Sequence, residues 1–185
     1  MLLFIRHGET VWGHQRRNQG ALDSPLTDLG IRQSLMNKKI LSSILDLTAP
    51  ELTVYISPST RSMETYKLIF ENNKNKLIVD ERIKAVSAGS WDGKSYIQLK
   101  EQGVELDEFD WQFHSPDGET YEDARKRANN WLQSVKEPSV VISHGLIGRV
   151  IFGEYLGYGY KDSLSIRIRQ NAVYKFDAGK ITEIT

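Results

Sequence analysis

Short apolar runs alternate along the chain with longer stretches in which apolar residues recur every three or four positions. Runs of β-branched and aliphatic residues are typical of buried strands, and the three-to-four spacing is typical of helices that bury one face. The predicted strands are Leu2–Ile5, Thr53–Ser57, Lys76–Asp80, Ser139–Ser143, Asn171–Asp177 and Lys180–Thr185. The predicted helices run from Asp28 to about Leu47, from about Ser59 to Phe70, from Tyr121 to Val135 and from Gly145 to Tyr155. This alternation predicts an α/β fold whose mostly parallel central sheet has helices on both faces.

Local signals mark some of the boundaries of these elements. Thr27 is a predicted N-cap for the first long helix, and Thr120 with Asp123 is a predicted capping pair for the third. The turn at Asp177–Lys180 indicates a closing hairpin, so the last two strands are expected to be antiparallel.

One stretch, Ala85 to Glu119, fits the alternation poorly. It combines glycines and a proline with several aromatic residues and acids. With no repeat elsewhere, we expect a single domain over residues 1–185, in which residues 85–119 form a short lid-like insertion over one end of the sheet. Such an insertion would shape the choice of substrate.

Composition narrows the function without naming it. The 185 residues include 24 Lys and Arg against 24 Asp and Glu, which argues against a general affinity for nucleic acid or for an anionic membrane surface. Any positively charged site must therefore be local. The chain has no cysteine, which excludes a disulfide framework, a thiolate nucleophile and thiolate-bound zinc. No apolar run is long enough to span a membrane, and a cytoplasmic protein is expected.

Three predicted strands are followed closely by arginine or histidine residues. The first ends at Arg6 and His7, the second leads into a helix that carries Arg61, and the fourth ends at His144 before another helix. Carboxyl ends of parallel strands share one edge, so these side chains are expected to meet in one crevice.

Arginine pairs with phosphate oxygens two at a time, and helix N-termini add positive potential, so a phosphoryl group is the ligand this crevice suits. A neutral imidazole could then attack phosphorus while a charged second imidazole stabilises its oxygens. Taken singly, each residue has an ordinary structural interpretation, namely a hydrogen-bonded strand-end histidine or a solvated helix arginine. Their coincidence at three strand ends favours a site. The four histidines lack metal-ligand spacing, so no metal is expected.

The chain also resembles a known family over nearly its whole length. The matching segments, in the family's order, are Leu3–Thr10, Gln19–Gly20, Asp23–Thr27, Gly30, Ser57–Arg61, Gly89–Gly93, Pro116–Thr120 and Val141–Gly145. They resemble the histidine phosphatase superfamily, in its phosphoglycerate mutase-like branch. The resemblance implies a three-layer α/β sandwich and no metal or cofactor. It also implies that His7 is the phosphorylated nucleophile, that Arg6 and Arg61 hold the phosphate, that His144 completes the pocket, and that Gln19, Gly20 and Gly145 bind substrate.

Two positions depart from the family pattern. Gly13 follows Trp12 where the family usually has asparagine, which removes one side-chain phosphate donor. Ala85 stands where the family has the glutamate that protonates the leaving group. Either a neighbouring carboxylate replaces it, with Glu81, Asp92 and Glu119 as the candidates, or the leaving group needs little help, or turnover is lost, or the alanine was engineered.

The sequence thus predicts a phosphatase that hydrolyses phosphomonoesters or other phosphoryl donors through a phosphohistidine on His7. Its substrate would be a small-molecule phosphate or a phosphoprotein. The alternative is a catalytically impaired domain that binds phosphorylated ligands or partner proteins. A phosphoglycerate mutase is the less favoured third interpretation, because mutases carry longer insertions that retain the intermediate.

Overall fold

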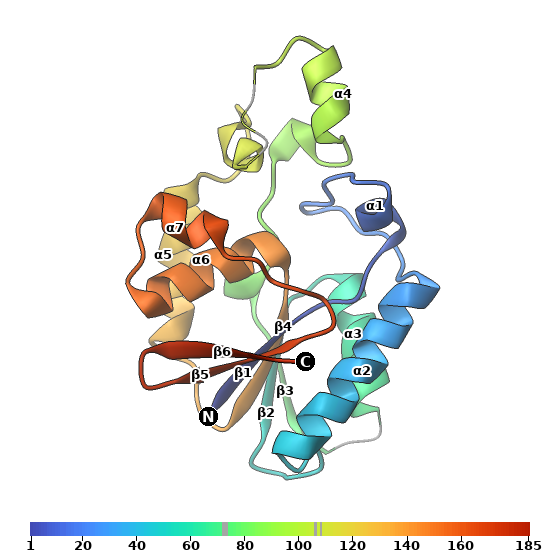
Figure 1. Ribbon diagram of the computed structural model, residues 1–185, viewed down its shortest axis with the longest axis vertical. Helices are drawn as coiled ribbons and strands as arrows, with labels where there is room; N and C mark the ends of the chain where they lie inside the picture. The colour runs from blue at the N-terminus through green and yellow to red at the C-terminus, as the bar shows by residue number, and fades with distance from the viewer. Residues whose placement is uncertain (72–73, 106, 108) are drawn as a thin grey trace.

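The computed structural model describes residues 1–71, 74–105, 107 and 109–185 (Figure 1). Its centre is a six-stranded sheet in the order β3-β2-β4-β1-β5-β6. The strands are β1 (Leu2–Arg6), β2 (Thr53–Ile56), β3 (Lys76–Val79), β4 (Ser139–Ser143), β5 (Val173–Asp177) and β6 (Lys180–Ile184). The first four strands are mutually parallel, whereas β5 is antiparallel to both β1 and β6.

Both faces of the central strands β1, β2 and β4 are buried, as the uninterrupted apolar runs predict. Successive residues of a strand point to opposite faces, so Leu2 and Phe4 of β1 join one core while Leu3 and Ile5 join the other. Burial of each such side chain contributes roughly 1.5–3 kcal/mol to folding. A strand that is apolar on both sides can therefore lie only in the middle of a sandwich.

Helices cover both faces of the sheet. The helices are α1 (Val11–His14), α2 (Asp28–Ile44), α3 (Thr60–Phe70), α4 (Tyr96–Glu101), α5 (Tyr121–Leu132), α6 (Gly145–Leu156) and α7 (Tyr160–Ser165), with single 3₁₀ turns η1 (Glu81–Ile83), η2 (Gly89–Trp91) and η3 (Trp111–His114). Helices α2 and α3 pack on one face, and α5, α6 and α7 pack on the other. Figure 1 shows the two groups on opposite sides of the sheet.

The predicted fold class, all six strands, the antiparallel final hairpin and the four long helices are confirmed, with boundaries that move by a few residues. Thr27 and Thr120 cap α2 and α5 as expected, each accepting a hydrogen bond from a backbone amide three residues on. The first long helix ends at Ile44, three residues earlier than predicted. The four-residue α1 and six-residue α7 were not predicted, because helices this short have too few turns to show periodicity.

The segment from Ala85 to Glu119 contains η2, α4 and η3, and Figure 1 shows α4 together with α1 beyond the carboxyl ends of the strands. Arg127 of α5 holds both ends of this segment. Its guanidinium pairs with the Glu119 carboxylate and donates to the carbonyls of Arg82 and Lys84. Within the described parts of the chain, no helix is both long and apolar enough to cross a membrane.

Candidate active site

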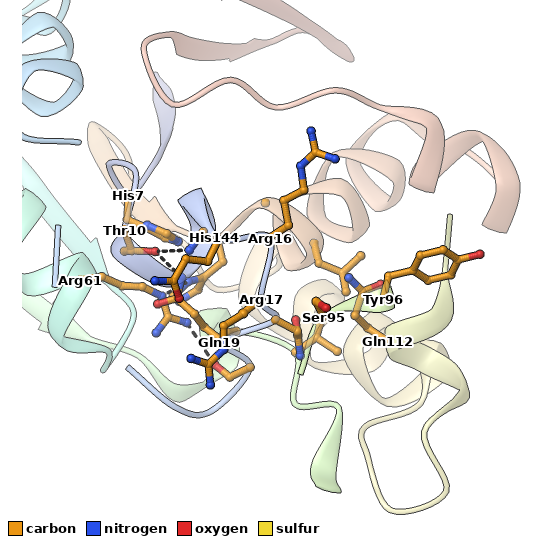
Figure 2. A pocket seen from close by; sticks show the side chains of 18 of the residues that line it. His7, Thr10, Arg16, Arg17, Gln19, Arg61, Ser95, Tyr96, Gln112 and His144 are labelled. Carbon is orange, nitrogen blue, oxygen red and sulfur yellow. Dashed lines mark hydrogen bonds between the residues drawn. The ribbon is translucent and has the colours of Figure 1, made fainter. Parts of the chain in front are cut away.

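The three strand ends singled out in the sequence lie side by side. Strands β2, β4 and β1 are consecutive in the sheet and run in the same direction, so Arg6, Ser57 and His144 are delivered to one edge. A cavity of about 490 Å³ opens there (Figure 2). Its described lining is Arg6, His7, Thr10, Gly13, Gln15, Arg16, Arg17, Asn18, Gln19, Gly20, Arg61, Ala85, Val86, Ser95, Tyr96, Ile97, Trp111, Gln112, His144, Gly145, Leu146, Arg149 and Gln170.

His7 is held in a single orientation at the floor of this cavity. Its side chain is 5% exposed, and its Nδ1 lies 2.8 Å from the Gly8 carbonyl oxygen. A carbonyl can only accept, so Nδ1 carries the proton and Nε2 keeps its lone pair. The turn is tight because Gly8 packs on the backbone of Gly30 at the start of α2, where a Cβ on Gly8 would overlap the Gly30 carbonyl. The local fold therefore presents a neutral imidazole with a free nucleophilic nitrogen.

His144 lies against His7, with ring centroids 5.0 Å apart. Arg61 Nε donates to His144 Nδ1 at 3.3 Å, so the proton is on Nε2, which donates to Ser57 Oγ at 2.6 Å. Both ring nitrogens thus have protein partners. A phosphoryl oxygen that is to receive a hydrogen bond from His144 must compete with Ser57.

Arg61 is 2% exposed, and the loop before α2 surrounds its guanidinium. It donates to the Leu22 carbonyl at 2.8 Å, to Asp23 Oδ1 at 2.7 Å and to the Gly20 carbonyl at 3.1 Å. The Asp23 carboxylate also accepts from the backbone N–H groups of Thr60 and Arg61 at the start of α3. Burial raises the pKa of Asp23, but these hydrogen bonds outweigh it and hold the pKa below its usual value. Arg61 therefore lines the cavity and also holds the loop before α2 in place through these hydrogen bonds.

Arg6 is less fully paired. Its NH1 donates to the Ile168 carbonyl at 3.2 Å, while its buried Nε has no hydrogen-bond partner within the described chain. Gly145 makes room for it, because a Cβ at Gly145 would lie 3.2 Å from the centre of the Arg6 guanidinium. The site therefore contains a buried N–H donor that an anion would satisfy.

Gln19 and Gly20 form part of the facing wall. Gln19 Nε2 donates to Thr10 Oγ1 at 2.6 Å, and Gln19 Oε1 is buried without a partner among the described residues. Gly20 has a left-handed backbone, with φ of 49°, and a Cβ there would overlap the Asp92 carboxylate. The glycine is thus required by packing, and its carbonyl is already bound to Arg61.

Positive charge dominates the electrostatics of the cavity. Burial is the main cause that holds the pKa values of His7 and His144 well below 6.5, and the nearby Arg61 and Arg6 act in the same direction. Burial, and then the charge of Arg149, lower the pKa of Arg6 to about 10. The lowered pKa and the hydrogen bond that His144 Nδ1 accepts from Arg61 both favour a neutral His144, whereas the sequence led us to expect a charged second imidazole during the reaction.

None of the three carboxylates considered as substitute acids lies in the described lining of the cavity. Glu81 is exposed and pairs with Lys84, and Glu119 is occupied by Arg127. Asp92 accepts four hydrogen bonds, from the Asn18 side chain, the Ser87 hydroxyl and the amides of Ala21 and Ala88. Ala85 does line the cavity. No Asp or Glu is present among the lining residues that the structure describes.

Several residues that line the cavity were not predicted from the sequence. Gln170 donates to the His7 carbonyl at 3.3 Å, and Arg149 lies one helical turn after Gly145 in α6. Arg149 could have been found from that four-residue spacing, which puts it on the same helix face as Gly145. Arg16 carries no such signal. The described residues contain no group of three or more His, Asp or Glu side chains placed to hold a metal.

Comparison with known proteins agrees with this geometry. The family model described as "Histidine phosphatase superfamily (branch 1)" matches residues 2–181. The chain is 28% identical to "Putative phosphoserine phosphatase 2" of Hydrogenobacter thermophilus, covering 99% of this chain and 88% of the relative. It is 25% identical to "Probable phosphoglycerate mutase GpmB" of Yersinia pestis, covering 94% of this chain and 82% of the relative. It is also 28% identical to "Fructose-2,6-bisphosphatase TIGAR" of Xenopus tropicalis, of which it spans 57%.

Solved structures share the fold. The alpha-ribazole phosphatase of Shigella flexneri superposes with a TM-score of 0.80 at 20% identity, covering 99% of this chain and 94% of the other. Bacillus stearothermophilus YhfR gives a TM-score of 0.80 at 24% identity, covering 98% and 94%. At this level of identity the likeness establishes the three-layer α/β architecture and no more.

Proposed function

The chain belongs to the histidine phosphatase superfamily, and from this premise we propose that it is a phosphatase that hydrolyses phosphoryl donors through a phosphohistidine on His7. One observation carries the proposal. The tautomer of His7 leaves Nε2 with a free lone pair in a cavity whose described lining includes five arginines and no carboxylate. A nucleophile of this kind is suited to attack a group whose charge the surroundings neutralise.

The proposed reaction has two displacements. In the first, the Nε2 lone pair of His7 forms a bond to phosphorus, and the bond from phosphorus to the leaving oxygen breaks, with the electron pair going to that oxygen. In the second, a water oxygen attacks phosphorus and the P–N bond breaks, which returns neutral His7 and releases phosphate. Arg6 and Arg61 are the proposed stabilisers of the phosphoryl oxygens, and the unpartnered Arg6 Nε supports this role. Gln19, Gly20 and Gly145 are proposed to bind and shape the bound group.

Proton supply limits the substrate class. We infer from the family resemblance that Ala85 replaces the acid glutamate, and its place in the cavity lining supports this inference. Without a carboxylate nearby, an aliphatic alkoxide leaves with difficulty. Aryl phosphates, acyl phosphates and phosphohistidine make smaller demands on an acid, so activated phosphoryl donors of small size are the proposed substrates. Residues 85–119, which supply seven lining residues, are the proposed lid.

A silent binding domain is the second candidate, and the acid-free lining favours it. Steady-state hydrolysis of an aryl phosphate separates the two. The phosphatase proposal expects turnover in the natural chain and a loss of at least about 10³-fold in His7→Ala, on the scale of removing a nucleophile. Tight phosphate binding without turnover would instead identify a binding domain. We infer a cytoplasmic location from a sequence that has no cysteine, and this stays a prediction.

A further inference from the structure

Two of the five arginines that line the cavity have no partner. The side chains of Arg6, Arg17 and Arg61 each donate hydrogen bonds to protein groups, whereas the guanidinium groups of Arg16 and Arg149 make no hydrogen bond or ion pair with the described residues. Buried charges are usually paired with a counter-charge, and this applies to the half-buried Arg149, whereas the exposed Arg16 is open to solvent. The described lining supplies none, because it contains no Asp or Glu.

The backbone places Arg16 at the mouth of the cavity in an unusual way. Arg16 has φ of 57°, the left-handed region that non-glycine residues seldom adopt. Its amide donates to the Gly13 carbonyl at 3.0 Å, and the next amide donates to the Trp12 carbonyl at 2.9 Å, so hydrogen bonds fix the turn. Strained residues of this kind cluster at ligand-binding positions. Figure 2 shows the Arg16 side chain standing apart from His7, Thr10, Gln19 and His144.

Arg149 comes from a different element, the first half of α6. It is half-buried, and burial lowers its pKa. Its charge also acts on Arg6, whose pKa it lowers. The positive charges of Arg149 and Arg6 repel each other in this partly buried place, and an anion bound beside Arg149 relieves that repulsion.

The cavity is also larger than the phosphoryl group needs. Its volume of about 490 Å³ falls in the range of sites that take a whole small molecule. Figure 2 shows the lid side chains Ser95, Tyr96 and Gln112 at the end far from the histidine pair. A molecule that fills the cavity would extend from His7 towards the lid.

We propose that Arg16 and Arg149 form a second anion subsite, so that the substrate is a small molecule with another anionic group, carboxylate or phosphate, besides the phosphoryl group that faces His7. The proposal rests on the phosphatase function proposed above and narrows its substrate class. It accounts for the two unpartnered guanidinium groups, the strained turn and the acid-free lining together.

The test uses phosphonates, whose C–P bond the enzyme cannot hydrolyse, so that binding is read separately from turnover. Calorimetry compares propylphosphonate with 3-phosphonopropionate, which replaces the terminal methyl by a carboxylate, and with ethane-1,2-bisphosphonate. Homologues with longer spacers cover the reach between the subsites. We expect at least one two-anion probe to bind about tenfold or more tightly than its one-anion partner, on the scale of one charge-assisted hydrogen bond. The carboxylate and bisphosphonate series identify which anion is preferred.

Variants assign the preference to the two arginines. Arg16→Asn removes the charge and keeps a residue that tolerates the left-handed backbone, and Arg149→Met keeps the buried stem. In each, the affinity ratio between two-anion and one-anion probes should fall towards one. Arg32→Met is the matched control, since Arg32 is exposed on α2, outside the described lining, and should leave the ratio unchanged.

Two results would overturn the subsite. One is a ratio close to one in the natural chain at every spacer length, and the other is an undiminished ratio in Arg16→Asn, whose exposed and unpartnered side chain makes misfolding an unsuitable explanation. Failure of the phosphatase proposal looks different. A chain without turnover that still prefers two-anion probes has the subsite and lacks the activity, whereas an active phosphatase with no such preference has the activity and lacks the subsite.

Discussion

Ala85 is the residue on which the proposed chemistry depends most. It lines the cavity, whose described lining contains no carboxylate. Ala85→Glu should therefore raise kcat/KM by about 10²- to 10⁴-fold for an alkyl phosphate and by much less for a phenyl phosphate, because only the alkoxide needs a proton to leave. Parallel assays of both substrates in both proteins measure this. Equal efficiency on the two substrates before mutation would mean that another group already acts as the acid.

The two buried histidines predict a pH dependence of stability with a definite sign. Their pKa values are lowered in the folded protein, chiefly by burial, whereas the unfolded chain takes up protons near the ordinary value of about 6.5. Below that pH the unfolded state binds more protons, so the free energy of unfolding falls as the pH falls. The full stability is present above about pH 6.5 and declines by about 1.4 kcal/mol per pH unit for each histidine.

Denaturant titration across this pH range checks the prediction. His144→Gln should flatten the slope below about pH 6.5, because it removes one of the two proton-binding differences. His14→Gln is the control, since the His14 side chain is 74% exposed and should leave the slope as it is. An unchanged slope in His144→Gln would contradict a neutral, buried His144.

Part of this site was predictable from residues alone. Arg6, His7, Arg61 and His144 follow directly from where strands end, and the structure brings all four together. The hydrogen-bond partners were not predictable, because Ser57 meets His144, and Arg61 meets Asp23, only through tertiary contacts. Arg16 was missed for the same reason. Its place at the cavity depends on a left-handed turn that no residue pattern indicates.

At the scale of elements, the loop that follows α1 and the proposed lid are joined through Asp92. Its carboxylate accepts from Asn18 and Ala21 of the loop and from Ser87 and Ala88 of the lid. The same loop supplies the Gly20 carbonyl that holds Arg61. Asp92 therefore ties the proposed lid to the wall of the cavity.

Replacing Asp92 should lower the stability of the fold and weaken phosphate binding. Asp92→Ala leaves part-buried donors without their charged acceptor, so we expect a loss of about 2–4 kcal/mol in the free energy of unfolding, together with weaker phosphate binding. Urea titration and calorimetry measure the two effects. The control is Glu101→Ala, an exposed acid at the end of α4, which should change stability by no more than about 0.5 kcal/mol. Unchanged stability and phosphate affinity in Asp92→Ala would rule out this tie.

Elements with a clear hydrophobic pattern were predicted from the sequence, and the short helices were not. Strands and long helices carry a period over several turns or residues, so six strands and four helices were found, with Thr27 and Thr120 marking where helices begin. The order of the strands in the sheet was not predicted. It depends on the pairing of β4 with β1 and with β2, strands more than eighty residues away in the chain, which no local pattern encodes.

At the scale of the whole molecule, charge is balanced overall and separated locally. Lysine and arginine equal aspartate and glutamate in number, yet the described cavity lining has five arginines and no acid. The expectation that any positive site must be local is confirmed. A neutral surface limits general attraction to polyanions, so the cavity can select small phosphorylated molecules by close contact.

The same feature predicts which step is slow. No described carboxylate in the lining can take a proton from the attacking water, so hydrolysis of the phosphohistidine should lag behind its formation. The phosphorylated protein should therefore accumulate during turnover of an aryl phosphate. This makes the intermediate accessible to direct detection.

The central claim is tested most directly by trapping that intermediate. The protein is mixed with a radiolabelled phosphoryl donor and quenched in base, and the acid-labile label is mapped by peptide mass spectrometry. The account predicts label on His7 in the natural chain, none in His7→Ala, and an unchanged amount in His14→Ala, where an exposed histidine near the site is removed. Label that persists in His7→Ala, or that maps to any other residue, would contradict it.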